Sequence, residues 1–118
     1  MKLSILDQSP RYEDERAEDA FQHTIQLAQL AEELGYHRFW VAEHHDSEHV
    51  VGSSPEVLIS HLLAKTHHIR IGSGGVMLQH YSPYKVAENF NVLASLFFLN
   101  RLLYLPIAVP TTFCFFIK

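Results

Sequence analysis

Short apolar runs along this chain alternate with longer segments in which apolar residues recur every three or four positions. A short run bounded by polar or turn-forming residues is typical of a buried strand, and a period near 3.6 is typical of a helix with one apolar side. On this basis the chain contains strands at 3–6, 38–42 and 69–76 and helices at 17–34, 55–66 and 83–97. The pattern therefore predicts three successive strand-helix units.

Residues at the ends of the periodic segments support these helices. Gly35 follows the first helix, where a C-terminal cap favours a residue that accepts positive φ. Ser54-Pro55 and Ser82-Pro83 precede the second and third helices, each as a serine N-cap followed by proline at the first helical position. Apolar residues cover most of the circumference of the second helix, so we expect it to be flanked on two sides.

Strand-helix units of about 30 to 40 residues predict parallel strands joined by right-handed crossovers, hence an α/β fold. A doubly wound sheet favours a glycine fingerprint after its first strand, but Asp7-Gln8-Ser9-Pro10 contains no glycine. A (β/α)8 TIM-type barrel makes no such demand and is our prediction. Because such a barrel has eight strands and about 250 residues, this chain of 118 residues supplies its N-terminal three βα units and leaves it incomplete.

Composition and charge exclude several classes of partner. The chain is 47% hydrophobic and 19% charged, which is ordinary for a globular protein. A net charge of -4 without a cluster of Lys or Arg gives no basis for binding nucleic acid or an anionic membrane. The N-terminus lacks the apolar core of a signal peptide, and the single cysteine, Cys114, cannot form an internal disulfide. We therefore expect a cytoplasmic protein.

Three ionisable residues, Glu43, His44 and His45, end the second apolar run. In parallel sheets, functional groups gather at the carboxyl ends of the strands. Side chains alternate along a strand, so His44 shares a face with Trp40 while Glu43 and His45 share the opposite face. Imidazole titrates near neutral pH, which makes His44 a candidate acid or base. The alternative for His44 is a structural contact at the strand end, and a structural role is our expectation for His45.

A metal site is another interpretation of the same stretch, which continues with Asp46, Glu48 and His49. Imidazole and carboxylate groups are common metal ligands. However, adjacent histidines diverge on a strand, and the loop has no zinc motif with fixed spacing. We therefore predict no metal site.

Gly72, Gly74 and Gly75 interrupt the third apolar run. Glycine weakens a strand unless another group must approach the backbone closely. The residues alone leave two explanations open, which are a bulge near the strand end and a surface that a ligand approaches.

Four motifs carry a family resemblance, and they are Leu6-Asp7-Gln8-Ser9-Pro10, Phe39-Trp40-Val41-Ala42-Glu43-His44-His45, Gly72-Ser73-Gly74-Gly75-Val76, and His80-Tyr81-Ser82-Pro83 with Ala87-Glu88. In this order and spacing over residues 1–97, they resemble the bacterial luciferase-like family of flavin-dependent monooxygenases. The opening motif is similar to one oxidoreductase branch of that family.

The resemblance implies a (β/α)8 barrel in which reduced FMN and O2 oxygenate a small organic substrate, with a flavin reductase as a partner that supplies the reduced FMN. It implies that His44 is the catalytic acid or base beside the flavin. It also implies that Leu6, Gly74 and Gly75 bind the cofactor, with a cis peptide between the two glycines. Tyr81 and its neighbour His80 either line the pocket or only precede the third helix. A deazaflavin-dependent oxidoreductase of the same fold is the enzymatic alternative.

Residues 98–118 depart from the family pattern, which normally continues with Pro-Gly-Arg and a further strand. We interpret 1–97 as a partial barrel domain and 98–118 as an aberrant hydrophobic tail. The uncharged run 102–117 holds two prolines, and its 16 residues are fewer than the roughly 20 of a membrane span. A truncated, non-catalytic fragment is the non-enzymatic alternative. Unpaired strand edges predict a homo-oligomer, or a chain that associates with itself or another chain.

Overall fold

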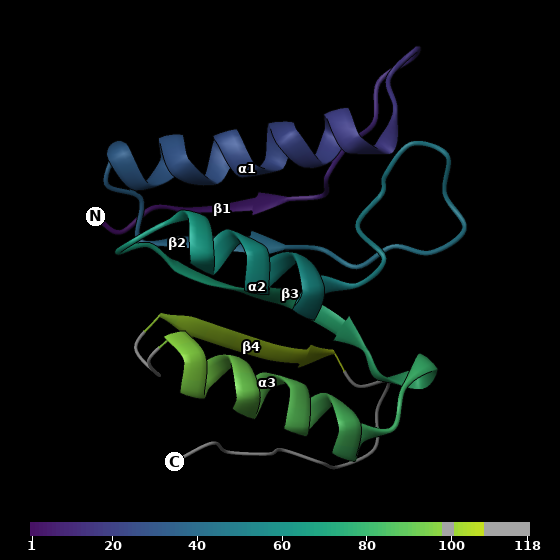
Figure 1. Ribbon diagram of the computed structural model, residues 1–118, viewed down its shortest axis with the longest axis vertical. Coiled ribbons are helices and arrows are strands. Elements are labelled where there is room, and N and C mark those ends of the chain that lie inside the picture. Colours follow the sequence, from purple (N-terminus) through teal and green to yellow (C-terminus); the bar gives the residue numbers. More distant parts are fainter. Residues whose placement is uncertain (98–100, 108–118) are drawn as a thin grey trace.

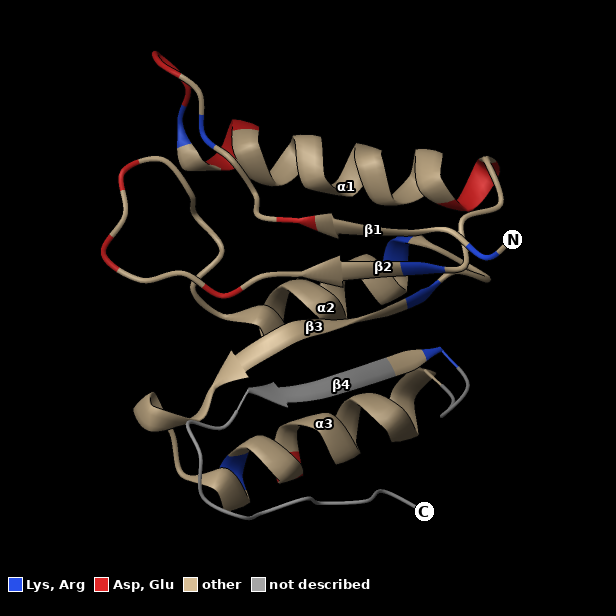
Figure 2. Cartoon of the chain, turned by 180° about the vertical axis from the view of Figure 1, so that it is seen from behind, with Lys and Arg blue, Asp and Glu red and all other residues tan. Residues whose placement is uncertain are grey.

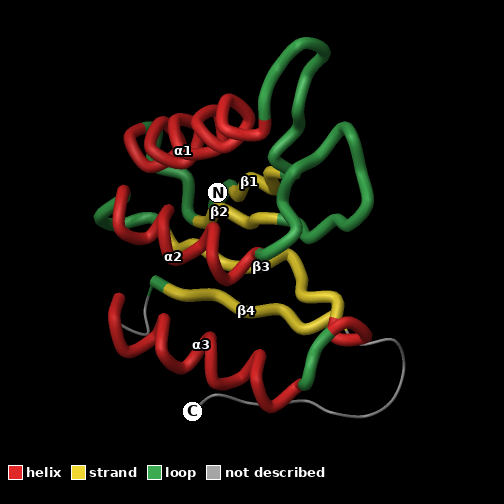
Figure 3. Tube along the Cα trace, turned by 45° about the vertical axis from the view of Figure 1, so that its right-hand side comes forward, coloured by secondary structure: helices red, strands yellow, loops and turns green. Residues whose placement is uncertain are grey.

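The computed structural model describes residues 1–97 and 101–107, which form a parallel α/β arrangement (Figure 1). In chain order its elements are β1 (Ser4–Asp7), α1 (Ala17–Glu33), β2 (Arg38–Val41), α2 (Pro55–Lys65), β3 (Arg70–Met77), the short 3-10 helix η1 (Leu78–His80), α3 (Pro83–Phe97) and β4 (Leu102–Ile107). The strands are parallel and lie in the order β1-β2-β3-β4. Figure 3 shows the three α-helices on one side of this sheet.

The predicted helices agree closely with α1, α2 and α3. Helix α1 ends at Glu33, and Gly35 follows it with a φ of 76°, as a C-terminal cap requires. Pro55 and Pro83 are the first residues of α2 and α3. Helix α2 contacts both α1 and α3, which confirms that it is flanked on two sides.

Strand β4 lies within residues 98–118, which the sequence analysis interpreted as an aberrant hydrophobic tail outside the family pattern. Residues 102–107 pair in parallel with β3, beginning with Leu102 opposite Ile71. The sequence analysis predicted no strand at residues 102–107, because these residues match no motif of the family. Backbone N–H and C=O groups along β3 nevertheless need partners, and any extended segment without a helix-forming pattern can supply them. Pro106 is compatible with this place because β4 is an edge strand among the described residues.

The core lies between the sheet and the helices. Phe39, Val41 and Ile71 are completely buried and point toward the helices, where they pack in one cluster with Ile59 of α2 and Phe90 of α3. Their alternation with partly exposed residues, as in the burial of β2, follows from the period of two along a strand. Full burial of each large apolar side chain contributes about 1.5 to 3 kcal/mol. This packing fixes which face of each strand remains free of helices.

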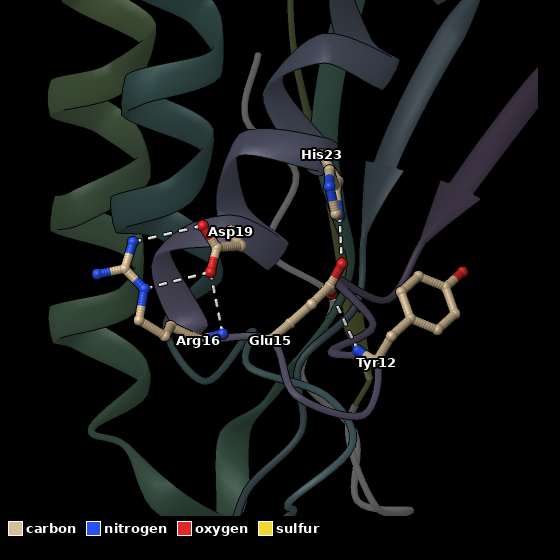
Figure 4. A network of polar contacts seen from close by, with 5 residues as sticks. All are labelled: Tyr12, Glu15, Arg16, Asp19 and His23. Atoms are coloured by element: carbon tan, nitrogen blue, oxygen red, sulfur yellow. Dashed lines mark hydrogen bonds and ion pairs between the residues drawn. The ribbon is translucent and has the colours of Figure 1, made fainter.

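The start of α1 is held by local polar contacts (Figure 4). The backbone N–H of Arg16 donates to Asp19 Oδ2 over 3.0 Å, and the Arg16 guanidinium also contacts this carboxylate. Glu15 accepts a hydrogen bond from the Tyr12 N–H over 3.0 Å and lies 3.7 Å from the His23 imidazole. Glu15 and Asp19 therefore satisfy N–H groups at and before the start of the first helical turn.

Within the described residues, no helix has the length and apolar character needed to cross a membrane.

Candidate active site

The carboxyl ends of β1, β2 and β3 bring the candidate residues to one edge of the sheet. In Figure 2 acidic residues follow β1 and β2 at this edge, and Lys and Arg lie at the opposite, amino ends of the strands. The antiparallel bridge between Pro10 and Val50 joins the loops after β1 and β2. The Val51 N–H donates to the Ser9 carbonyl over 3.1 Å, which holds the two loops together.

Leu6 and Gly74 lie on the sheet face that carries no helix, which we call the open face. The register places Leu6 beside Trp40 and Trp40 beside Gly72, so these positions form one row across β1, β2 and β3. Gly74 lies two residues beyond Gly72, and a Cβ built on it would lie 2.9 Å from Leu6 Cδ1 and 3.3 Å from Trp40 Cβ. Leu6 is 55% exposed. The structure therefore brings two of the predicted cofactor residues into contact.

His44 is held at the end of β2 by its backbone, and its side chain has a free polar atom. Its N–H donates to the Gly52 carbonyl over 2.9 Å. The side chains of Glu43 and His45 bond to each other on one side of the chain, so alternation turns His44 toward the open face. His44 Nε2 is buried and has no hydrogen-bond partner among the described residues. A buried polar atom without a partner is unfavourable, which makes it available to a ligand.

Glu43 is the centre of a polar network that the sequence analysis did not identify. Its side chain is 1% exposed and accepts three hydrogen bonds, from His45 Nε2 over 2.6 Å, Tyr81 Oη over 2.7 Å and the Met77 N–H over 2.7 Å. The His80 ring lies with its centroid 4.7 Å from that of His45. The network joins the end of β2 to the end of β3 and to the segment before α3.

Tyr81 takes part in this network as a hydrogen-bond donor. Burial raises the pKa of Tyr81 above its ordinary value, and the hydrogen bond and negative charge of Glu43 raise it further. Tyr81 therefore remains a protonated donor to the carboxylate. The contact of His45 with Glu43 agrees with the structural role expected for that histidine.

A second buried network holds the end of β1 against α1. Asp7 Oδ2 accepts hydrogen bonds from Thr24 Oγ1 over 2.6 Å and from the Ser9 N–H over 3.2 Å. Thr24 Oγ1 also lies 3.0 Å from Ser9 Oγ, and all three residues are buried. Ser9 has a φ of 51°, so this turn is a strained backbone position that the network stabilises. Sequence spacing alone could not reveal the contact, because it joins residues 17 positions apart.

Gly75 lies beside Gly74 in an irregular part of β3. The register between β3 and β4 shifts between Ser73 and Val76, and Gly75 is buried there. The expected cis peptide between the two glycines is wrong, because the described chain contains no cis peptide bond.

Other candidate cavities and ligand groups lie away from these residues. A cavity of about 430 Å³ lies between α1 and α2, on the helix side of the sheet, and Phe21, Ile25 and Val57 are among its apolar lining residues. Because this cavity lies on the helix side of the sheet, it is separate from the open face that carries Leu6 and Gly74. Across residues 1–97 and 101–107, no group of three or more His, Cys, Asp or Glu side chains is placed to hold a metal ion.

Comparison with known proteins places this geometry in a family. The family model described as luciferase-like monooxygenase matches residues 1–98. The protein YwcH of Bacillus subtilis is 68% identical over 96 residues, and the N-acetyl-S-alkylcysteine monooxygenase of the same organism is 62% identical over 96 residues. Each match covers 81% of this chain and 29% of the relative. The chain thus spans less than a third of the length of these curated relatives.

Solved structures show the same fold. Apo-MsnO8 has a TM-score of 0.83 at 48% identity, with 86% of this chain and 30% of that chain covered. A second match is the oxygenating constituent of 3,6-diketocamphane monooxygenase from Pseudomonas putida, solved in complex with FMN. It has a TM-score of 0.84 at 21% identity, and the match covers 94% of this chain and 30% of that protein's chain. An F420-dependent secondary alcohol dehydrogenase has a TM-score of 0.66 at 21% identity, and the match covers 86% of this chain and 29% of the dehydrogenase chain. By its family match, this chain belongs to the luciferase-like monooxygenases.

Proposed function

We propose that this chain is the flavin-facing N-terminal part of a monooxygenase that uses reduced FMN and O2 to oxygenate a small organic substrate. The observation that carries the proposal is the free, buried Nε2 of His44 at the strand edge that also presents Leu6 and Gly74. Family membership and the FMN named for the Pseudomonas structure support the choice of cofactor. The substrate remains a small organic molecule of unassigned class.

The residues present fit a flat, uncharged ring system. Leu6 and Trp40 offer apolar surface on the open face, and the missing side chain at Gly74 lets their atoms lie close to the β3 backbone. An alanine at position 74 would push on Leu6, the residue that would contact the ring. Leu6, Gly74 and Gly75 are therefore the residues assigned to hold the flavin.

His44 is the residue assigned to proton transfer. When bound, the reduced flavin supplies the electrons that activate O2. Imidazole exchanges a proton near neutral pH, and the buried Nε2 of His44 has no hydrogen-bond partner in the described part of the chain. The Glu43 network holds the adjacent backbone, so that His44 is presented from a rigid strand end.

Partners and alternatives follow from the same proposal. The reduced flavin would come from a separate reductase, in line with the name of a relative from Acinetobacter baylyi, the oxygenase component of a flavin-dependent trigonelline monooxygenase. A deazaflavin is the alternative cofactor, because one fold relative uses F420. The chain is proposed to act in the cytoplasm and to associate with itself or with another chain. A non-catalytic fragment is the second candidate, favoured by the loss of the family pattern after Phe97.

The test uses a chimaera in which residues 1–96 of this chain replace the matching segment of the Bacillus subtilis relative YwcH. His44→Ala in that chimaera should lower turnover by about 10²-fold or more while FMN still binds, because a general acid or base contributes about 10² to 10⁴. FMN binding is followed by fluorescence titration, and F420 is titrated in parallel to decide between the cofactors. Unchanged turnover would return His44 to a purely structural role.

A further inference from the structure

The last residues of β3 lie beyond its pairing with β2. The register between these two strands ends at Ser73, and β3 continues to Met77. On the other side of β3, the register with β4 shifts between Ser73 and Val76. Gly74 and Gly75 are therefore opposite no residue of either neighbouring strand in the described register. Because glycine restricts its own backbone very little, this stretch depends on contacts at its ends for a fixed position.

Glu43 supplies the contact that β2 itself does not offer to the end of β3. Strand β2 ends at Val41, and the Glu43 side chain accepts a hydrogen bond from the Met77 N–H at Oε2 over 2.7 Å. In a longer ladder a backbone carbonyl would accept this N–H. A carboxylate is the stronger acceptor, since charge-assisted hydrogen bonds are roughly twice as strong as neutral ones. The position of Met77, just after the two glycines and Val76, therefore depends on where this carboxylate is held.

Tyr81 holds the Glu43 carboxylate in place. The Glu43 side chain is 1% exposed, and a buried carboxylate needs hydrogen-bond donors to be stable. Tyr81 Oη donates to Oε1 over 2.7 Å. Burial raises the pKa of Tyr81, and the hydrogen bond and charge of Glu43 raise it further, so the hydroxyl remains a donor near neutral pH. The role of His45, which lies 2.6 Å from the same oxygen, depends instead on the tautomer of its ring.

The contacts of Tyr81 close a short loop at the end of β3, where the chain turns before it enters α3 (Figure 1). Helix η1 lies between Met77 and Tyr81, and the Tyr81 N–H donates to the Leu78 carbonyl over 3.2 Å. Both ends of this segment bond to one carboxylate, Met77 to Oε2 and Tyr81 to Oε1. Tyr81 Oη also donates to the Ser53 carbonyl over 3.4 Å. The hydroxyl therefore links the ends of β2 and β3 to the segments that lead into α2 and α3.

The ring and the hydroxyl of Tyr81 have separable roles. The ring packs against the core cluster as a partly buried group. Phenylalanine would provide the same packing, whereas only a hydroxyl can donate to the carboxylate. If Tyr81 acts through its hydroxyl, its removal changes the end of β3. If Tyr81 acts only through packing, the end of β3 stays as it is.

We propose that Tyr81 is a positioning residue for the cofactor, because its hydroxyl acts through Glu43 to fix the end of β3 and so holds Gly74 and Gly75 in place for the flavin. This role rests on the proposed function, which assigns these two glycines to the flavin. Without the hydroxyl, the end of β3 leaves its fixed position more often. A ligand that binds only the fixed form then binds more weakly, and a saturating concentration of the ligand restores that form. The loss therefore falls on affinity and not on turnover.

The first test uses the chimaera with YwcH. Tyr81→Phe should raise the Kd for FMN in a fluorescence titration by about fivefold or more, because one hydrogen bond to a charged acceptor changes a local equilibrium by about tenfold or more. Turnover at saturating FMN should stay within about threefold of that of the unsubstituted chimaera. Tyr84→Phe is the matched control and should change neither quantity, since Tyr84 is 75% exposed near the start of α3. His44→Ala should show the opposite pattern, with FMN bound and turnover lost.

The second test needs no flavin and uses the chain of 118 residues. Hydrogen exchange of the Met77 amide should become about tenfold faster in Tyr81→Phe, because the acceptor of this N–H is then held less firmly. Amides in the middle of α1 should exchange as before, and circular dichroism checks that the variant is folded. If Tyr81→Phe does not fold, Glu43→Asp gives the same comparison, since it retains the charge but shortens the reach of the carboxylate.

These measurements separate the role of Tyr81 from the proposed function. Equal FMN affinity of the Tyr81→Phe chimaera, or equal exchange of the Met77 amide, would overturn the role of Tyr81 even where His44→Ala abolishes turnover. If His44→Ala leaves turnover unchanged, the proton-transfer role of His44 fails, while weaker FMN binding and faster exchange in Tyr81→Phe would still support positioning. A chimaera that binds no FMN before any substitution would overturn both.

Discussion

Glu43→Gln is the substitution for which the structure allows the most detailed expectation. The carboxylate uses one oxygen for His45 and Tyr81 and the other for the Met77 N–H. A glutamine amide has only one acceptor oxygen, so its NH2 group must face either the Met77 N–H or the two side-chain donors. In either orientation at least one buried donor loses its acceptor, and the remaining hydrogen bonds lose their charge.

The expected loss follows from the number of hydrogen bonds affected. One hydrogen bond to a charged group contributes about 1.5 to 3 kcal/mol, and two others weaken toward the value of about 1 kcal/mol for neutral pairs. Glu43→Gln should therefore lower the free energy of unfolding by about 3 kcal/mol. For a domain of this size each kcal/mol moves Tm by about 4 to 8 °C, so Tm should fall by at least about 12 °C.

The assay is urea and thermal unfolding of the chain followed by circular dichroism, with Glu48→Gln as the control in the exposed loop. A spectroscopic titration of tyrosine ionisation provides a local measurement. Because Glu43 helps to raise the pKa of Tyr81, that tyrosine should ionise at lower pH in the variant. A loss of less than about 1 kcal/mol, with an unchanged tyrosine titration, would show that the network does not hold the strand ends together.

Three further outcomes follow from the structure. Burial opposes ionisation of Glu32, but its backbone N–H donors lower its pKa below the ordinary 4.5. The ionised carboxylate therefore stabilises the fold fully above pH 4.5, and this stabilisation is lost as the pH falls through the lowered pKa of the folded state. The loss of stability with falling pH should be shallower for Glu32→Gln, measured by acid unfolding. In the chimaera, Gly75→Val should weaken FMN binding by about tenfold, because a β-branched side chain has no room at a buried strand position, and equal affinity by fluorescence titration would remove Gly75 from the site. The 118 residues alone should not sustain flavin turnover, since their described strands number four and a barrel needs eight; oxygen consumption with reduced FMN and an aldehyde panel, compared with a blank without protein, checks this.

Local pattern was sufficient to predict the three helices, the first three strands and the alternation of side chains along the second strand. These features depend on the period of apolar residues and on caps such as Gly35 and Pro55, which act over a few positions. The same alternation predicted that Glu43 and His45 share one side of the chain, and their side chains do contact each other. The approach of Leu6 to Gly74 was not predictable in this way, because β2 lies between their strands.

Only the tertiary structure decided which polar groups meet and which remain free. Glu43 reaches Tyr81 and Asp7 reaches Thr24 across 38 and 17 positions of sequence, and no local period encodes such contacts. Strand β4 forms from an apolar run outside the family pattern because the edge of β3 offers hydrogen-bonding groups to any extended neighbour. Arg38 and Arg70 are 32 positions apart in the sequence, each at the start of a strand. The parallel register of β2 and β3 places these two like charges side by side.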